Sequence, residues 1–310
     1  MDESAITEPT QDAVERALRE DLVRADRAIA SVRPVLRHVL AHDDPALFND
    51  EVIARVRGMM RDLARQLLQT QAASGGERDV PAFVGERFDA LVMKLSDDTE
   101  LLAHAHALAL EARLLDALRL RTGVEPVLPP LIVELAAGTD ADLAELAMHA
   151  LAAQARFVQQ QHRMALPLAE LPAELFHAAT AAQDDDDAAR LLRQDYAEGH
   201  GRQALLTRLA IAIGHTPDRA LSVEHAGLSV LASALALAAD QPRDAIIVSL
   251  AIRHSSRLAL TLRAVGLAPA AIDRQLAALQ AVPELPAAVG QIATERAAAL
   301  LTSALLEPAT

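Results

Sequence analysis

The sequence predicts an all-α protein built from stacked antiparallel helix pairs, either a HEAT-like array or an irregular helical bundle, with an N-terminal helical hairpin. Apolar residues make up 52% of the 310 residues but aromatic residues only 2%, so Leu, Ala, Val and Ile must form the core. Ala and Leu favour helices, whereas strands prefer β-branched and aromatic residues. Apolar side chains also recur every three or four residues, and no segment shows the two-residue alternation of a strand.

Residues 1–75 are expected to form the helical hairpin. A first helix over residues 11–32 and a second over residues 50–73 each carry a long apolar stripe, with a short helix expected at 34–42. The sequence Ser74-Gly75-Gly76 then predicts a flexible joint. The stripe of the first helix could pack on the body of the same chain or on a second copy. We favour the second copy, and hence a homodimer.

Residues 80–200 are expected to form an acidic helical region. Local signals place most of its helix ends: Ser96 or Asp97 as a cap, Gly123 as a stop, Pro129-Pro130 as a start, and Thr139 or Asp140 as the next cap. The last of these helices should reach about Met164. Two shorter helices, about 172–182 and 185–198, are expected to complete the region.

Residues 201–310 are expected to form a C-terminal helical region. Glycines and prolines at the spacing of helix pairs divide it into short helices. The expected ranges are 201–213, 222–239, 242–253, 255–265, 269–280 and 286–306.

Charge and composition narrow the possible functions. The net charge is −14; residues 201–310 contain nine Arg and eight acidic residues, so residues 1–200 carry −15. Such an acidic portion repels nucleic acids and anionic membranes. The chain has no cysteine, no apolar run near the roughly 18 residues of a membrane span, and an acidic N-terminus unlike a signal peptide. We therefore expect a cytoplasmic protein without a membrane, and no cofactor is needed for folding.

Three Glu–His pairs have the spacing that places both side chains on one face of a helix. They are Glu100/His104, Glu145/His149 and Glu174/His177. Chance alone gives about 1.4 such pairs in this composition, and a ferritin-like di-metal site would need two Glu-x-x-His motifs where this chain has one. The prediction is therefore no metal site, and these six residues are retained only as the alternative.

Other charged patterns also have structural explanations. Asp184 to Asp187 precede a helix and are expected to cap it, because carboxylates there accept hydrogen bonds from unpaired amides. His225 lies in an apolar helix and is expected to be a core or interface residue. Residues 242–280 contain five arginines around a turn at Gly266, a pattern that a helix-turn-helix would share. Burial in a helical array explains this pattern as well.

Two tracts, RMALPLAELPAELFHAA and LASALALAADQPRDAIIVSLAIRHSSRLALTLRAVGLAPAAIDRQL, carry a resemblance to a known family. Residues 90–280, and above all the run from Arg263 to Ile272, resemble a family of Ala/Leu-rich helical bacterial proteins described as a domain of unknown function. The resemblance implies a helical, repeat-like cytosolic protein, and it supplies no site residue.

The sequence as a whole favours a noncatalytic protein-interaction or regulatory module of a bacterial cytosol over an enzyme. Its partner would be a protein of unknown identity. An enzyme or ligand-binding protein with a metal site between helices is the alternative, and a DNA-binding regulator is the third possibility.

Overall fold

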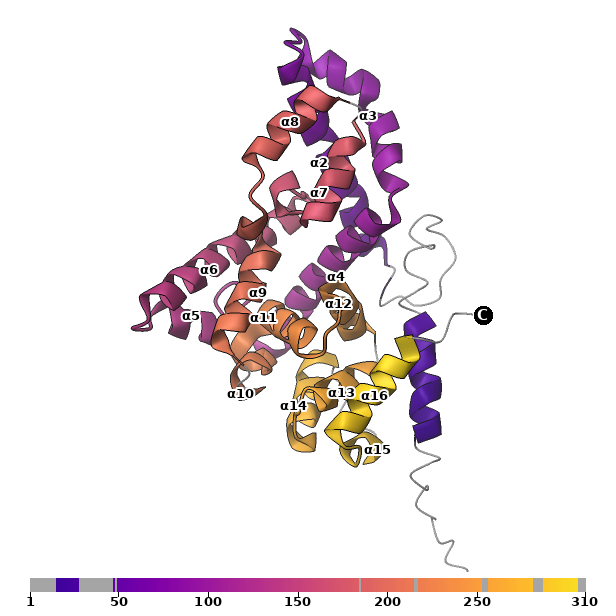
Figure 1. Ribbon diagram of the computed structural model, residues 1–310, viewed down its shortest axis with the longest axis vertical. Helices are drawn as coiled ribbons and strands as arrows, with labels where there is room; N and C mark the ends of the chain where they lie inside the picture. The colour runs from indigo at the N-terminus through magenta and orange to yellow at the C-terminus, as the bar shows by residue number, and fades with distance from the viewer. Residues whose placement is uncertain are drawn as a thin grey trace, which may run out of the picture.

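The computed structural model describes residues 15–27, 47, 49–183, 185–214, 217–252, 256–280 and 287–305. Within these ranges the only regular structure is helix, and no strand is present (Figure 1). This confirms the all-α prediction. The HEAT-like stacking is not confirmed. None of the helices described is both long and apolar enough to cross a membrane.

Helices α2 (Asp50–Ser74) and α3 (Val80–Ser96) pack against each other at one end of the molecule (Figure 1). Asn49 caps α2 because its side chain accepts a hydrogen bond of 2.8 Å from the amide of Val52. The predicted apolar stripe of α2 is buried: Val52, Val56, Met59, Leu63 and Leu67. The predicted joint ends α2 at Gly75, and Gly76 has a positive φ of 67°.

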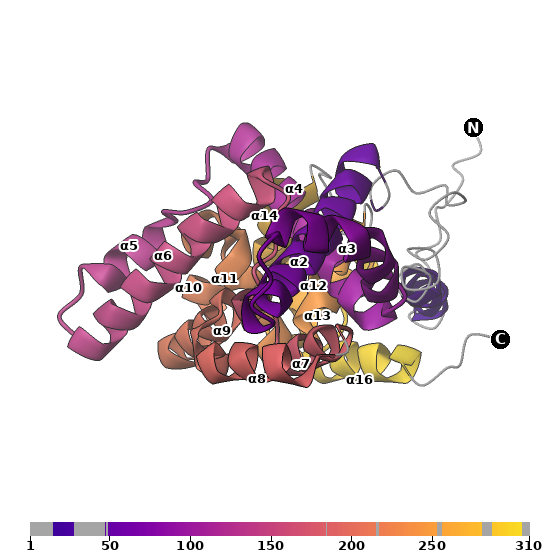
Figure 2. The same cartoon turned by 90° about the horizontal axis from the view of Figure 1, so that it is seen from above.

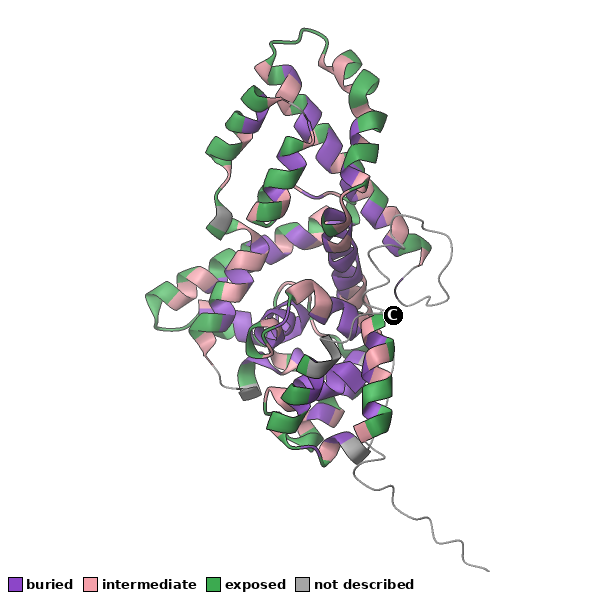
Figure 3. Cartoon of the chain, turned by 45° about the vertical axis from the view of Figure 1, so that its right-hand side comes forward, coloured by how far each residue is buried: buried purple, intermediate pink, exposed green. Residues whose placement is uncertain are grey.

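Helix α4 (Thr99–Thr122) is the central helix, and it packs on α2, α11 and α12. Asp98 caps it, one residue after the predicted cap, and Gly123 ends it in the left-handed conformation, with φ 75°. Nearly every residue from Leu101 to Ala112 is buried. Figure 3 shows buried residues concentrated in the middle of the molecule, where α4 runs.

Helices α5 (Pro130–Ala136) and α6 (Ala141–His162) form a pair that extends to one side of the molecule (Figure 2). They start at Pro130 and after the Asp140 cap, as predicted. Their apolar faces pack on α9 (Arg202–Ile213) and α11 (Val223–Ala238) in a second, smaller apolar cluster. This pair is therefore anchored along one face only.

The chain then returns to α2 through two short helices. A 3-10 turn (Leu168–Glu170) leads into α7 (Ala173–Ala181) and α8 (Asp186–Asp195), and α8 packs on α2. Phe176 and Tyr196 stack with ring centroids 4.0 Å apart, and the Tyr196 hydroxyl donates a hydrogen bond of 2.8 Å to the Leu171 carbonyl. These contacts hold α7 beside the end of α8.

Glycine is required at one position inside α11. Gly227 has φ 73° and ψ 164°, which kinks the helix. A Cβ at this position would lie 2.9 Å from Cβ of Pro129, just before α5. Both the positive φ and the close approach of the α5 start exclude a larger residue without strain.

The remaining helices complete the C-terminal part of the molecule (Figure 1). A second 3-10 turn (Glu198–His200) precedes α9. Most of the predicted boundaries in this part agree within two residues, although the last predicted helix is divided into two. The bounds are α10 (Pro217–Ala220), α12 (Arg243–Ala251), α13 (Ser256–Ala264), α14 (Pro269–Gln280), α15 (Ala287–Gly290) and α16 (Thr294–Leu305).

The N-terminal helix, residues 15–27, lies beside α16 in Figure 1. Its polar side chains contact α13 and α16. Glu15 pairs with Arg296 on α16 at 2.5 Å. On α13, Ser256 donates a hydrogen bond of 2.6 Å to Asp21, and Arg257 pairs with Asp26.

The structure thus does not confirm the hairpin of residues 11–32 with 50–73, and it shows the alternative in which this helix packs on its own chain. The expected helix at 34–42 lies outside the described residues, and the homodimer stays a prediction.

The main apolar core crosses all three predicted regions. One continuous cluster includes Leu18 and Leu63 from residues 1–75, Leu108 from 80–200, and Leu231 and Leu300 from 201–310. The boundaries at 75, 80 and 200 therefore do not separate independent cores among the described residues. The division of the chain into these three regions remains a prediction.

Candidate binding pocket beside a buried ion cluster

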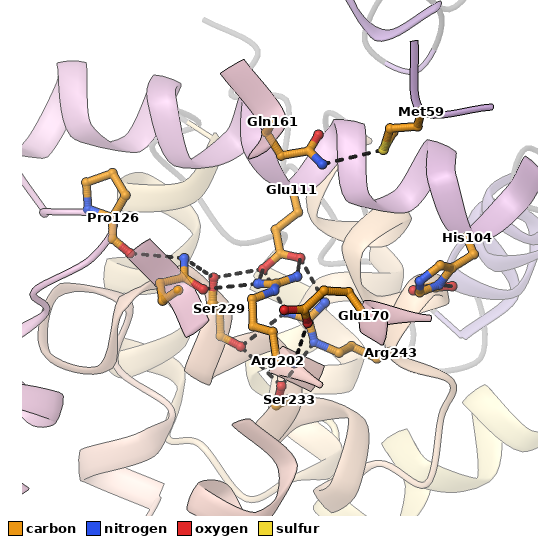
Figure 4. Close-up of polar contacts among 12 residues, drawn as sticks. Met59, His104, Glu111, Pro126, Gln161, Glu170, Arg202, Ser229, Ser233 and Arg243 are labelled. Carbon is orange, nitrogen blue, oxygen red and sulfur yellow. Dashed lines mark hydrogen bonds and ion pairs between the residues drawn. The ribbon is translucent and has the colours of Figure 1, made fainter. Parts of the chain in front are cut away.

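Glu111 on α4 is fully buried and accepts hydrogen bonds from two arginines (Figure 4). Arg202 of α9 reaches its two carboxylate oxygens at 2.8 and 2.7 Å. Arg243, at the start of α12, reaches the same two oxygens at 2.9 and 2.7 Å. The hydroxyl of Ser229 on α11 donates a further hydrogen bond of 2.7 Å. One carboxylate therefore joins four helices.

Other side chains complete this ion cluster. Arg202 lies over the ring of Phe157, with its guanidinium carbon 3.6 Å from the ring centroid, and donates a hydrogen bond of 3.1 Å to Gln154. Arg243 donates a hydrogen bond of 3.0 Å to the hydroxyl of Ser233. Gln154 also donates hydrogen bonds to Ser229 and to the Pro126 carbonyl. The cluster thereby links α6 to the other four elements.

The electrostatics of the cluster keep Glu111 ionised. Burial alone opposes ionisation, but the charges of Arg202 and Arg243 and their hydrogen bonds outweigh it and hold the pKa of the carboxyl well below its usual range. Burial likewise opposes the charged form of Arg243, but the charge of Glu111 and its hydrogen bonds outweigh burial and raise the pKa of the Arg243 guanidinium. Glu111 and Arg243 are thus held charged inside the protein, where their pairing offsets the loss of water.

The sequence did not predict this cluster, although one signal was present. Glu111 is the only acidic residue in LLAHAHALALEA, residues 101–112, a stretch that is apolar on every face. Such a helix is expected to be buried, and a buried carboxylate needs a partner. That reasoning could have selected Glu111. It could not have selected Arg202 and Arg243, which lie 91 and 132 positions away.

A pocket of about 630 Å³ opens beside the cluster, between α4, α7, α9 and α12. Four carboxylates lie in its lining: Asp98, Glu100, Glu174 and Asp244. Arg243 belongs both to this lining and to the ion cluster, so the cluster fixes one wall of the pocket.

His104 lies in the pocket lining with only 3% of its side chain exposed. Its Nδ1 is 2.9 Å from a carboxylate oxygen of Asp244, the residue that follows Arg243 at the start of α12. Its Nε2 is buried and has no hydrogen-bond partner among the residues that the structure describes. The pocket therefore includes a fixed imidazole with one unsatisfied nitrogen.

The structure brings together three of the six residues considered as metal ligands. Glu100, His104 and Glu174 line one pocket. His177 is exposed on α7, with its ring edge against Phe176, and Glu145 and His149 are exposed on α6. Among the residues described, no three His or acidic side chains are placed to hold a metal ion. The pocket is thus a recess with both charged and apolar side chains in its lining, and the sequence located it only in part.

The aspartate run caps a helix as predicted. Asp185 is the N-cap of α8, and its side chain accepts hydrogen bonds of 3.0 Å from the amides of Asp187 and Ala188. Asp186 and Asp187 lie in the first turn, and Asp187 pairs with Arg190 at 2.5 Å. Asp184 lies outside the described residues. The capping explanation holds for Asp185, and Asp186 and Asp187 lie in the first turn, where a carboxylate complements the helix dipole.

The remaining polar predictions concern His225 and the arginines of residues 242–280. His225 is partly exposed on α11 and lies 3.5 Å from Glu134 of α5, at an interface between helices. Arg243 and Arg257 are buried in ion pairs, and Arg263 donates hydrogen bonds to the carbonyls of Ile292 and Leu267. These three arginines are used inside the protein, which leaves a smaller basic surface than the sequence suggested.

No family model, curated protein or solved structure matches this chain. The resemblance of residues 90–280 to a family of Ala/Leu-rich helical proteins therefore stays a prediction.

Proposed function

We propose that this protein is a noncatalytic binding module and that the pocket between α4, α7, α9 and α12 contacts its protein partner. The observation that carries the proposal is the pocket lining itself: four carboxylates and His104 on α4, α7 and α12, of which the Glu111 cluster joins α4 and α12. A rigid, preformed recess with a few converging polar groups is the usual form of a recognition site.

The charged groups beside the pocket support a binding role over a catalytic one. Both oxygens of Glu111 accept hydrogen bonds from Arg202 and Arg243, so this carboxylate is committed to joining helices. Arg243 is committed in the same way. These groups position the pocket walls, and a positioned wall favours binding without loss of conformational entropy.

The net charge of −14 favours a basic partner. Opposite charge increases the rate of association and discriminates against acidic partners. Glu174 is exposed on α7 and lies in the pocket lining, so a partner can reach it without any change in the fold.

The proposal can be tested by reversing one charge in the pocket. Wild-type protein, Glu174→Arg and the control Glu145→Arg would each capture proteins from an extract of the native host, with quantification by mass spectrometry. Glu145 is an exposed glutamate in α6, as Glu174 is in α7, but it lies outside the pocket. We expect Glu145→Arg to recover the wild-type partners and Glu174→Arg to lose them. Equal recovery by all three proteins would contradict the proposal.

A further inference from the structure

We infer that the pocket binds a cation rich in N–H groups, a guanidinium or a primary ammonium, with the carboxylates and the free nitrogen of His104 as hydrogen-bond acceptors. The inference concerns the ligand chemistry of the pocket, and it rests on the proposed function only where it assigns the cation to an arginine or lysine side chain of the partner.

The sign of the ligand charge follows from the lining. Asp98, Glu100, Glu174 and Asp244 place four carboxylates around one recess. The single guanidinium in the lining, that of Arg243, is hydrogen-bonded at 2.7 Å to Glu111, a carboxylate that it shares with Arg202, and four carboxylates outnumber it. An anionic ligand would therefore meet acidic groups without a free basic partner, whereas a cation would meet opposite charge.

The requirement for N–H groups follows from His104. Its Nδ1 lies 2.9 Å from a carboxylate oxygen of Asp244, so in the neutral ring the tautomer with the proton on Nδ1 can donate to that carboxylate. Nε2 is then an acceptor, and within the described part of the chain it is buried without a partner. A buried acceptor without a donor is costly, so a ligand that supplies an N–H to it gains more than an ordinary surface contact would give. Ionised carboxylates are also hydrogen-bond acceptors only, so the acidic side chains of the lining favour a ligand that carries N–H donors.

The pocket fits an organic cation better than a metal ion. Within the described part of the chain, no three His or acidic residues are close enough to hold a metal. Apolar groups complete the lining, among them Leu175, Ala178 and Val248. They can contact the methylene stem of a side chain while its charged end meets the carboxylates. The volume of about 630 Å³ lies within the range of small-molecule sites.

The inference is tested by titrating the full-length protein with simple probes at low salt, followed by calorimetry and protein-observed NMR. The probes are n-butylguanidinium and n-butylammonium, which separate the two possible sources of N–H groups. Tetramethylammonium is a cation without N–H groups, and butyrate is an anion of similar length. We expect saturable binding of at least one of the first two probes, and binding of tetramethylammonium and butyrate that is at least about tenfold weaker.

Matched variants locate the site. Glu174→Gln and Asp244→Asn should each lower the affinity for the probe by about tenfold, because each removes one charged acceptor. Glu145→Gln, on α6 outside the pocket, should bind it like the wild type. Glu174 is exposed, so its variant keeps the fold and remains informative even if Asp244→Asn perturbs α12.

Three results would overturn the inference: no binding of either N–H probe, equal binding of tetramethylammonium, or unchanged affinity in Glu174→Gln. The proposed function fails separately. Loss of partner capture in Glu174→Arg without any probe binding would contradict only the ligand class. Probe binding at the pocket with unchanged partner capture would contradict only the proposed function.

Discussion

Helices α4 and α6 begin alike and yet place the same sequence pattern in opposite environments. Each has an aspartate N-cap, and each carries a Glu and a His four residues apart: Glu100/His104 on α4 and Glu145/His149 on α6. His104 is buried against α12 and hydrogen-bonded to Asp244, whereas His149 is exposed. The spacing puts a pair on one face of a helix, but the element that covers that face decides what the pair can do.

The rest of each helix explains this difference. From residue 101 to 112, α4 is apolar on every face, so it packs on α2, α11 and α12 at once. Helix α6 has one apolar face, which includes Ala147, Ala150 and Phe157, and one polar face. It packs mainly on α5 and α9. Polar groups in this part of α4 must therefore find partners inside the protein, whereas polar groups on the outer face of α6, such as Glu145 and His149, meet solvent.

The largest expected effect is on stability, and it is tested by replacing one glutamate on each helix. Glu111→Gln would leave Arg202 and Arg243 buried beside each other without a counter-charge, so we expect a loss of about 3–5 kcal/mol in the free energy of unfolding. Glu145→Gln, on the exposed face of α6, should change it by less than about 0.5 kcal/mol. Urea unfolding at neutral pH measures both. Similar stabilities of the two variants would show that the ion cluster does not stabilise the fold.

A second effect depends on pH. Burial lowers the pKa of His106 on α4. The hydrogen bond to the Leu47 carbonyl and the charge of Asp244 raise it by less, so the pKa is about 4. The unfolded chain takes up this proton below about pH 6.5, while folded His106 stays neutral down to about pH 4. Its stabilising contribution is therefore complete above pH 6.5 and is lost as the pH falls towards 4.

The measurement is the free energy of unfolding at pH 7 and pH 5. We expect His106 to account for a loss of about 2 kcal/mol between these values. Between pH 7 and pH 5, the free energy of unfolding of His106→Gln should fall by about 2 kcal/mol less than that of the wild type. His149→Gln on α6 should follow the wild-type profile. An unchanged profile in His106→Gln would contradict the assignment.

The smallest expected effect is the loss of an N-cap, and it should be equal in the two helices. Asp98 accepts hydrogen bonds from the amides of Glu100 and Leu101 at 3.0 and 3.1 Å, and Asp140 accepts one from Leu143 at 3.1 Å. Capping is local to each helix start, so Asp98→Ala and Asp140→Ala should each cost about 1 kcal/mol. Thermal and urea unfolding would measure both. A much larger loss in Asp98→Ala would mean that tertiary contacts at α4 also depend on this carboxylate.

Much of the fold could be predicted because its signals are local. Caps, prolines and glycines act within a few residues, so the starts of α5 and α6, the end of α4 at Gly123 and the capping by Asp185 agree closely with expectation. The candidate site was predicted only in part. Glu100, His104 and Glu174 were selected by their spacing, but as possible metal ligands, and Asp244 was not connected with them.

By itself, the sequence determined the helical class, most helix boundaries and the burial of the apolar stripes, because backbone hydrogen bonds and side-chain periodicity act over three or four residues. Only the tertiary structure decided which distant groups meet. The contacts of Asp244 with His104, of Arg243 with Glu111, and of Arg296 with Glu15 span 140, 132 and 281 positions. Such pairings depend on how whole helix faces fit together, and a pattern within one helix contains no information about its partner.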